Sequence, residues 1–414
     1  MTPRMIALRS SSLFDGSVFM DDGVTVVVDG ESIAGVLRGH PDLGSDVEVI
    51  ELGEATVLPG LIDTHVHLVA GSGVRALDLV EGYSDQEIEA VVTRSLAAHL
   101  AAGVTTVRDL GDRRFVVVNR RDEQHARPLT TARPWTPTIL AAGPPLTTPR
   151  GHCHYLGGEV SGPVEIEAAV QERIDREVDV VKVMASGGMA TTGTDVMMPQ
   201  FSLAEMRLIV DLAHAAGIAV TAHAHALPAV EIALAAGVDG LEHCSCLTPQ
   251  GPRVSDELLA VLAERQVPIG AALMAPPPES FEHAPPNIKK VMAQLGMTPE
   301  TMLESRRSMV GRMHAAGVRF VGGSDAGIEP FMAHGLMRSG LGFLLSAGAS
   351  VSQTLAAGTS LAAAACGLTR KGFLRQGFDA DLVVVDGRFD SDLAPLAQVR
   401  QVMLGGRFAP AGLT

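Results

Sequence analysis

Short runs of β-forming apolar residues, broken by turn residues, occur near both ends of the chain. Val24–Val28 and Ile33–Leu37 flank the dipeptide Asp29-Gly30, which is the arrangement of a β-hairpin closed by a tight turn. A similar pattern recurs late in the chain, in Asp381–Val385 and Val399–Leu404. We therefore expect the two chain ends to pair with each other in one small β domain.

The centre of the chain has a longer hydrophobic period, with signals for helix starts. Ser84 with Glu87, and Ser202 with Glu205, each form the pattern of a capping box, in which the side chains of the N-cap residue and of the residue three positions later bond to each other's backbone N–H groups. Thr298-Pro299 adds an N-cap followed by proline at the first helical position. These signals predict helices that alternate with apolar strands.

Four helical segments end in the same way, with two alanines, a glycine and an apolar branched residue. The glycines are Gly103, Gly217, Gly237 and Gly317. Glycine is the residue that most easily takes the left-handed conformation at a helix end, and the branched run that follows indicates a buried parallel strand. Repeated units of this kind, with about eight plausible strands, favour an α/β fold with a (β/α)8 TIM-like barrel. A doubly wound sheet is the alternative, but no glycine-rich phosphate loop opens a first helix.

The resulting domain division has three segments. Residues 1–57 and 371–414 are predicted to form the two parts of a small β-sandwich domain, and residues 58–370 the barrel.

Residues with metal-binding side chains follow those glycines at even distances. They are Asp109, His223 and His243, each six residues on, and Asp325, eight residues on. On strands that begin in the same way, even distances place side chains on one face. They also place them near the carboxyl ends of the strands, where barrel enzymes keep their active sites.

Two apolar runs carry further candidates. The run that starts at Leu58 ends in His65-Val66-His67, and residues two apart on a strand point the same way, so both imidazoles can bind one metal ion. The run Val178–Met184 holds Lys182 in its middle, where an unpaired ammonium group is costly to bury. Lys182 can extend to solvent, act as a deprotonated base, or be converted into an anion.

Taken together, these motifs resemble the amidohydrolase superfamily, in particular its binuclear-metal branch of dipeptidase-like and imidazolonepropionase-like hydrolases. The resemblance covers nearly the whole chain. Its motifs are Pro59–His67, Lys182–Gly188, Thr221–His225, Gly240–His243, Gly323–Gly327 and Asp379–Val384.

The resemblance implies a site with two divalent metal ions. His65 and His67 would bind one ion, His223 and His243 the other, and Lys182, carbamylated by CO2, would bridge both. Asp325 would bind the first ion and carry the proton. Zinc is the metal expected from these ligands, with manganese, cobalt and iron as alternatives. The implied reaction is hydrolysis of a carbon–nitrogen bond in an amide or cyclic amide, such as a dipeptide or N-acyl compound, by a metal-bridging hydroxide.

Other residues are candidates for substrate contacts. His225 lies two residues past His223 on the same predicted face, so it is either the alternative ligand or a group nearer the substrate. In the loop after the predicted third strand, Thr138–Ala142, Arg150 or Tyr155 is a candidate for binding a carboxylate and His154 for polarising a carbonyl. His152 belongs to the same group, and the alternative is an ordinary polar loop.

Three features receive structural interpretations. Asp109 is expected to form an ion pair with Arg108 or Arg113, or to support the site indirectly. Cys244 and Cys246 are expected to be buried free thiols, since no further ligands for a thiolate metal site are evident. The proline-rich stretch Ala275–Pro286 is a candidate lid or a rigid surface excursion.

Composition narrows the class of protein. The 414 residues carry a net charge of −15 and 46% hydrophobic residues, which suits a folded enzyme acting on small molecules and disfavours nucleic acid and anionic membranes. Four cysteines and no apparent signal segment lead us to expect a cytoplasmic protein. The oligomeric state stays open, with a homo-oligomer among the alternatives.

Other functions remain alternatives. A mononuclear deaminase of the same superfamily is disfavoured, because the expected glutamate three residues after a ligand histidine is Ala226 or Cys246 here. A lactonase- or phosphotriesterase-like hydrolase uses a similar ligand set. A non-catalytic barrel scaffold would have lost ligands that this chain retains.

Overall fold

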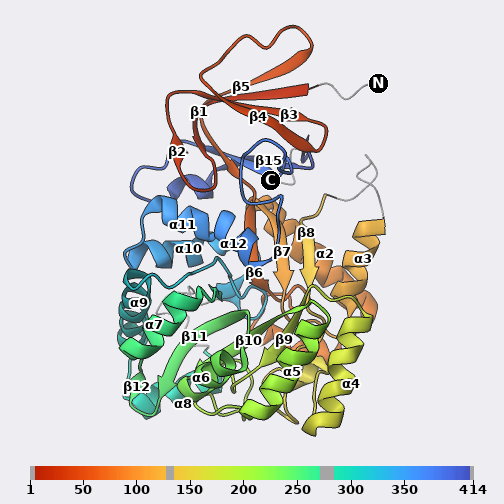
Figure 1. The fold of residues 1–414 in the computed structure, drawn as a ribbon, viewed down its shortest axis with the longest axis vertical. Coiled ribbons are helices and arrows are strands. Elements are labelled where there is room, and N and C mark those ends of the chain that lie inside the picture. Colours follow the sequence, from red (N-terminus) through yellow and green to blue (C-terminus); the bar gives the residue numbers. More distant parts are fainter. Residues whose placement is uncertain (1–4, 127–134, 271–283, 411–414) are drawn as a thin grey trace.

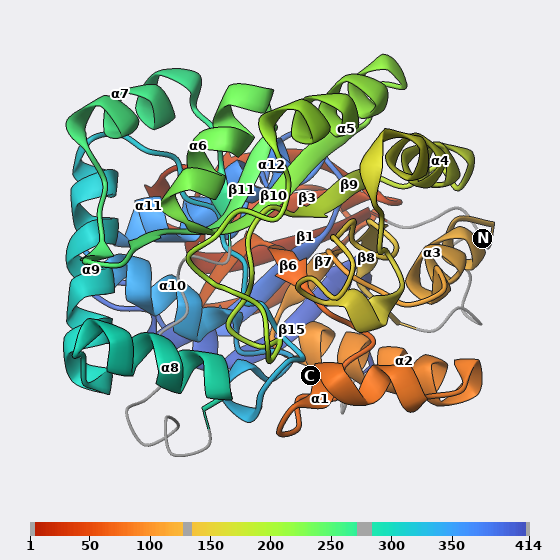
Figure 2. The same cartoon turned by 90° about the horizontal axis from the view of Figure 1, so that it is seen from below.

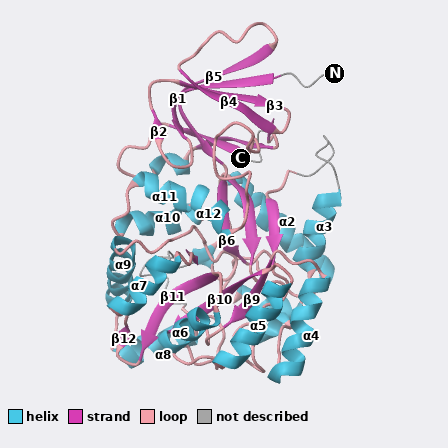
Figure 3. Cartoon of the chain, viewed as in Figure 1, coloured by secondary structure: helices cyan, strands magenta, loops and turns pink. Residues whose placement is uncertain are grey.

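The computed structural model describes residues 5–126, 135–270 and 284–410. Two parts of the chain can be distinguished: a sheet built from both chain ends, and a larger part in which strands are surrounded by helices (Figures 1 and 3). Among the described helices, none is both long enough and apolar enough to cross a membrane.

The first part is one eight-stranded sheet in the order β16-β15-β14-β5-β1-β3-β4, with β2 paired to β1. Its strands are β1 (Met5–Phe14), β2 (Phe19–Met20), β3 (Val24–Asp29), β4 (Ser32–Arg38), β5 (Val47–Pro59), β14 (Leu382–Asp386), β15 (Val399–Leu404) and β16 (Arg407–Phe408). The predicted hairpin of β3 and β4 is present. The two chain ends meet where β5 pairs antiparallel with β14, with Val57 opposite Val384.

The second part begins where β5 ends. Its strands are β6 (Leu61–Val66), β7 (Val104–Asp109), β8 (Thr138–Ala141), β9 (Val180–Met184), β10 (Ala219–Ala226), β11 (Gly240–Thr248), β12 (Gly251–Pro252) and β13 (Ile269–Gly270). All but β12 pair in parallel, in the orders β6-β7-β8 and β9-β10-β11-β13. The sequence pattern also predicts a strand over Pro268–Met274; β13 forms its start, and its residues beyond Gly270 lie outside the described residues.

Single backbone bridges connect these sheets. Leu146, just after β8, bridges to Val183 of β9, and Phe320 bridges to Ile269 of β13. Ala326 then bridges back to Val66 of β6. The strands and the segment 318–326 therefore follow one another around a closed circuit, with helices outside it (Figure 2).

The described helices of this part are α1 (Ala76–Leu79), α2 (Asp85–Ala101), α3 (Val116–Ala126), α4 (Gly162–Asp175), α5 (Leu203–Ala215), α6 (Leu227–Ala236), α7 (Asp256–Arg265), α8 (Pro286–Leu295), α9 (Pro299–Ala315), α10 (Met337–Ser346), α11 (Val351–Ala357) and α12 (Ser360–Ala365). Helices α2, α5, α6 and α9 begin or end where the sequence signals predict. Ser84, Ser202 and Thr298 form capping boxes. The four exit glycines all have φ between 76° and 92°, so glycine is required there.

Candidate metal centre

Two groups of buried side chains with metal-binding atoms face one cavity at the ends of the strands. In each group the ligand atoms lie within 4.8 Å of one another. The first group is His65, His67 and Asp325; the second is His223, His225 and His243. The structure thus brings together the four predicted histidine ligands and Asp325, with His225 beside them.

In the first group, one carboxylate oxygen lies between two imidazoles. Oδ1 of Asp325 is 3.2 Å from Nε2 of His65 and 3.3 Å from Nε2 of His67. The other ring nitrogens are occupied: Nδ1 of His65 is 2.9 Å from Oε2 of Glu242, and Nδ1 of His67 is 3.3 Å from the Gly111 carbonyl oxygen. Both Nε2 atoms are therefore directed at one point, as in metal sites where an outer hydrogen bond fixes the ring.

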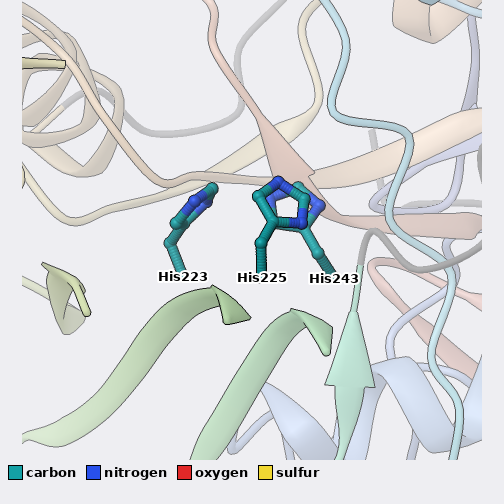
Figure 4. A group of neighbouring side chains, drawn as sticks. All are labelled: His223, His225 and His243. Atoms are coloured by element: carbon teal, nitrogen blue, oxygen red, sulfur yellow. The ribbon is translucent and has the colours of Figure 1, made fainter. Parts of the chain in front are cut away.

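The second group contains only imidazoles, which project together from β10 and β11 (Figure 4). The rings of His225 and His243 stack at 4.6 Å, and that of His223 meets His243 at 4.7 Å. Nδ1 of His225 is 2.9 Å from the Ser245 hydroxyl, and Nε2 of His223 is 3.3 Å from the Gly187 carbonyl oxygen. Nε2 of His225 and Nδ1 of His223 are the second ring nitrogens, and each can bind a further partner.

The backbone at His243 corrects one step of the sequence reasoning. His223 is in register with Glu242, whereas His243 is in register with Ala224. Glu242 bonds to Thr221 and His65, so it points into the circuit, and a regular strand would turn His243 outward. His243 and Cys244 instead have φ of 66° and 44°. The left-handed backbone, not an even distance from Gly237, directs His243 into the site.

Lys182 on β9 lines the same cavity and is 1% exposed. Its Nζ has no hydrogen-bond partner, and burial lowers the pKa of its amine to about 8. Its charge depresses the pKa of His65 in the first group and of His223 in the second. The alternative in which Lys182 extends to solvent is therefore wrong, because its side chain is buried in the cavity with both groups.

Burial also sets the protonation of the other groups. It lowers the pKa of His65 to about 4, and the pKa values of His223 and His243 well below their usual range. Burial alone would raise the pKa of Asp325, but His65, His67 and His243 hold it well below its usual value. Neutral imidazoles and an ionised carboxylate are the forms that bind metal ions.

The predicted substrate contacts divide into two sets. His152 and His225 line the cavity, and the His152 ring lies 4.4 Å from that of His223. Arg150 is exposed and Tyr155 is directed at Thr191. Neither of these, nor His154, belongs to the described lining.

The structural interpretations have mixed outcomes. Among the described ion pairs, Asp109 has none with Arg108 or Arg113. It accepts hydrogen bonds from the backbone N–H groups of Leu68 and Gly111 and thereby fixes the backbone near the site. Cys244 and Cys246 are buried free thiols, as predicted. Of the stretch Ala275–Pro286, residues 275–283 lie outside the described residues. Its last residue, Pro286, is the first residue of α8.

Two buried acids of this site were missed from the sequence. Glu242 accepts hydrogen bonds from Thr221 and Arg108 besides its contact with His65. Asp63 accepts from the hydroxyl and backbone of Ser324, next to Asp325. Each acid is the single Asp, Glu, Lys or Arg of its strand, β11 for Glu242 and β6 for Asp63, which is the same signal that marks Lys182 in the sequence.

The chain belongs to the amidohydrolase family, whose model matches residues 56–409. It is similar to ochratoxinase of Aspergillus niger, with 28% identity over an alignment 216 residues long that covers 46% of this chain and 43% of that protein. It is also similar to imidazolonepropionase of Salinispora tropica, with 26% identity over an alignment 260 residues long that covers 56% of this chain and 58% of that protein. The chain therefore spans about half the length of these relatives.

Solved structures share the fold over a greater length. The structure of a Xaa-Pro dipeptidase with methionine bound in its active site superposes with a TM-score of 0.85 and 24% identity. The superposition covers 98% of this chain and 99% of the dipeptidase chain. The structure of A. niger ochratoxinase has a TM-score of 0.81 and 21% identity, covering 99% of this chain and 96% of its own. The resemblance to the amidohydrolases is thus confirmed.

Proposed function

We propose that this protein is a metal-dependent hydrolase that cleaves a carbon–nitrogen bond in an amide or cyclic amide. Membership of the amidohydrolase family supports this proposal, as do relatives named ochratoxinase and imidazolonepropionase. Because a similar structure named as a dipeptidase holds methionine in its active site, we propose dipeptides or N-acyl amino acids as the substrates of this chain.

One observation carries the proposal: two groups of ligand atoms share a cavity with a buried lysine whose Nζ has no hydrogen-bond partner. A packed core has no reason to collect five imidazoles around one carboxylate. A lysine amine left without a partner at full burial is costly, and conversion into a bridging anion removes that cost.

The side chains fit a pair of divalent ions. His65, His67 and Asp325 would hold one ion and His223 and His243 the other, with zinc the proposed metal and Lys182 shared. CO2 would add to the neutral amine of Lys182, with loss of one proton, to give a carbamate with two oxygens. Such ions would acidify a water molecule and polarise the scissile carbonyl.

The chain's own residues perform the remaining tasks. Asp325, ionised at neutral pH, accepts the proton of the attacking water and delivers it to the leaving nitrogen. Glu242 and the Gly111 carbonyl hold the rings of His65 and His67. His152, held at Nδ1 by the Thr191 hydroxyl at 2.8 Å, is placed to contact the substrate beside His223.

Membership of the amidohydrolase family also supports a proposal for the fold. We propose that the circuit of strands is a (β/α)8 barrel over residues 58–370, and that residues 1–57 and 371–414 form a β-sandwich around the eight-stranded sheet. A cytoplasmic location stays a prediction of the sequence.

Metal content and amide hydrolysis together test this function. The purified protein is loaded with zinc and bicarbonate and analysed for metal per chain, then assayed for amine release from dipeptides and N-acyl amino acids. We expect about two ions per chain, and activity that chelation removes and zinc restores. His214 pairs with Asp239 at the surface, so His214→Ala is a matched control for His65→Ala.

A result other than two ions per chain with amide cleavage would change the proposed function. About one ion per chain would favour a mononuclear deaminase, and two ions without amide cleavage would favour a lactonase- or phosphotriesterase-like hydrolase. No bound metal would indicate a non-catalytic scaffold.

A further inference from the structure

Three polar groups meet at the hydroxyl of Thr191, beside the cavity that holds both ligand groups. Oγ1 of Thr191 lies 2.8 Å from Nδ1 of His152 and accepts a hydrogen bond from the backbone N–H of Cys153 at 3.0 Å. The Tyr155 hydroxyl is 3.2 Å from the same oxygen. All four residues are buried. These contacts use the whole capacity of a hydroxyl, which is one donor hydrogen and two lone pairs.

The directions of these bonds follow from what each partner can do. The Cys153 N–H can only donate, so it takes one lone pair of Oγ1. The Tyr155 hydroxyl has two acceptors within reach, Oγ1 of Thr191 at 3.2 Å and Sγ of Cys153 at 3.9 Å. The oxygen is the stronger of the two, because sulfur accepts weakly. With both lone pairs taken, the hydroxyl hydrogen of Thr191 is directed to Nδ1 of His152.

This assignment fixes the tautomer of His152. A ring that accepts a hydrogen bond at Nδ1 carries its own hydrogen on Nε2. Sγ of Cys153 is 3.6 Å from Nε2 but also 3.7 Å from Nδ1, so the sulfur is in line with neither nitrogen. Since His152 lines the cavity, its Nε2–H is the polar group that the ring offers to a bound molecule.

The place of the ring is fixed as firmly as its tautomer. A Cβ atom at Gly188 would lie 2.2 to 2.3 Å from three atoms of the His152 ring, so only glycine allows this close approach. Asn287, near the start of α8, donates to the carbonyl oxygens of Gly188 and Thr191 at 2.9 and 2.6 Å. One buried side chain thus holds both the glycine against the ring and the threonine that bonds to it.

We propose that Thr191 is a positioning residue that keeps the hydrogen of His152 on Nε2, and that this N–H donates a hydrogen bond to the oxygen of the scissile carbonyl. The proton stays on Nε2 throughout. The bond strengthens as negative charge develops on the oxygen during attack, which is the condition for a catalytic gain. This inference rests on the proposed function and goes beyond it, because it makes His152 a donor and assigns Thr191 a part in the reaction.

The opposite tautomer would give His152 a different chemistry. With its hydrogen on Nδ1, the ring would present a lone pair at Nε2, which can bind a metal ion or accept a proton. The Tyr155 hydroxyl would then have only the sulfur of Cys153, at 3.9 Å, to receive its hydrogen. A direct reading of the tautomer therefore decides between a donor and a ligand or base.

Nitrogen NMR reads the tautomer without relying on turnover. The protein is labelled with 15N-histidine and loaded with zinc, and comparison with His152→Ala identifies the signals of His152. We expect Nε2 to be protonated and Nδ1 to be unprotonated. Methylphosphonate is then added as the probe, because its tetrahedral oxyanion resembles a carbonyl under attack. It should shift the Nε2–H signal of His152.

Variants test the part played by Thr191. Thr191→Val keeps the shape of the side chain and removes the hydroxyl, so we expect kcat to fall by about 10-fold, as for the loss of one hydrogen bond, with KM and metal content unchanged. The shift caused by methylphosphonate should also become smaller. Thr191→Ser should restore most of both effects. Thr192→Val is the matched control, because Thr192 is the next residue and is exposed, and its kcat should equal that of the unaltered protein.

The outcomes separate this proposal from the proposed function. A hydrogen on Nδ1 of His152 in the unaltered protein would overturn the proposal, even if Thr191→Val does not fold. So would a His152 signal that methylphosphonate does not move, or full kcat in Thr191→Val. A shifted Nε2–H signal in a protein that cleaves no amide would instead overturn the proposed hydrolysis and leave the donor role of His152 in place.

Discussion

The two ligand groups of the cavity differ in what surrounds them. In the first group, Asp325 supplies a negative charge, and Glu242 and the Gly111 carbonyl fix the imidazoles. In the second group, the three imidazole rings stand together, and their polar contacts with the described residues outside the group are to the Ser245 hydroxyl and the Gly187 carbonyl. The first group contains its own anion, and the second contains none.

This difference indicates that the two groups would bind metal for different reasons. A dication beside Asp325 and Glu242 is compensated by carboxylates within the fold, and its ligands are oriented by outer contacts. A dication beside three neutral imidazoles depends on an anion from elsewhere. Lys182 is the described residue that can supply one, as a carbamate. The second group should therefore be the more sensitive to changes at Lys182.

Replacing Lys182 tests this dependence most severely. We expect Lys182→Ala to lose the second ion entirely, to weaken the first, and to lower kcat/KM by about 1000-fold or more, as for a residue that acts within a unit. Metal analysis and amide hydrolysis measure both effects. Lys182→Glu is the matched variant, since its carboxylate replaces the carbamate and should retain more metal. Two ions and full activity in Lys182→Ala would refute the carbamate.

Asp325→Asn removes the anion of the first group while keeping its shape. The amide cannot accept a proton, so we expect kcat to fall by about 100- to 10,000-fold, the usual range for a general acid–base residue. Loss of metal should be confined to one ion per chain. A nearly unchanged kcat at full metal content would show that Asp325 does not carry the proton.

The second group offers a choice between two histidines. We expect His223→Ala to lose one ion and to lower activity by about 100-fold or more, whereas His225→Ala keeps both ions and changes KM more than kcat. Metal content and steady-state kinetics of the two variants decide this. The opposite pattern would make His225 the ligand and His223 the substrate contact.

The sequence predicted those parts of the fold that depend on local rules. Capping boxes at Ser84 and Ser202 and left-handed glycines at helix ends are encoded within a few residues, as is the shared face of His65 and His67. Lys182 was conspicuous because a lone charge in an apolar strand requires an explanation, and the structure gives it none in the form of a hydrogen bond.

The parts that the sequence did not predict depend on residues far apart in the chain. Glu242 meets His65 across 177 positions, and no local pattern connects them. His243 enters the site through a backbone with φ of 66°, which alternation along a strand does not anticipate. Arg306 of α9 lines the cavity, whereas Arg150 is exposed, and this difference comes from the packing of the helix and not from the neighbours of either residue in the sequence.

Glu242→Gln should have the smallest effect and should act on the first group alone. The variant retains a side chain of the same shape but removes the charge that orients His65 and pairs with Arg108. Removal of such an outer partner weakens metal binding by about 10- to 100-fold. Competition with a chelator, which resolves the two ions by affinity, should show one weakened site and one unchanged. Asp239→Asn removes a similar carboxylate–histidine contact at His214, away from the cavity, and should leave both affinities unchanged. Equal weakening of both sites by Glu242→Gln would mean that the two groups share one network, and that their contrast in surroundings has no consequence for metal binding.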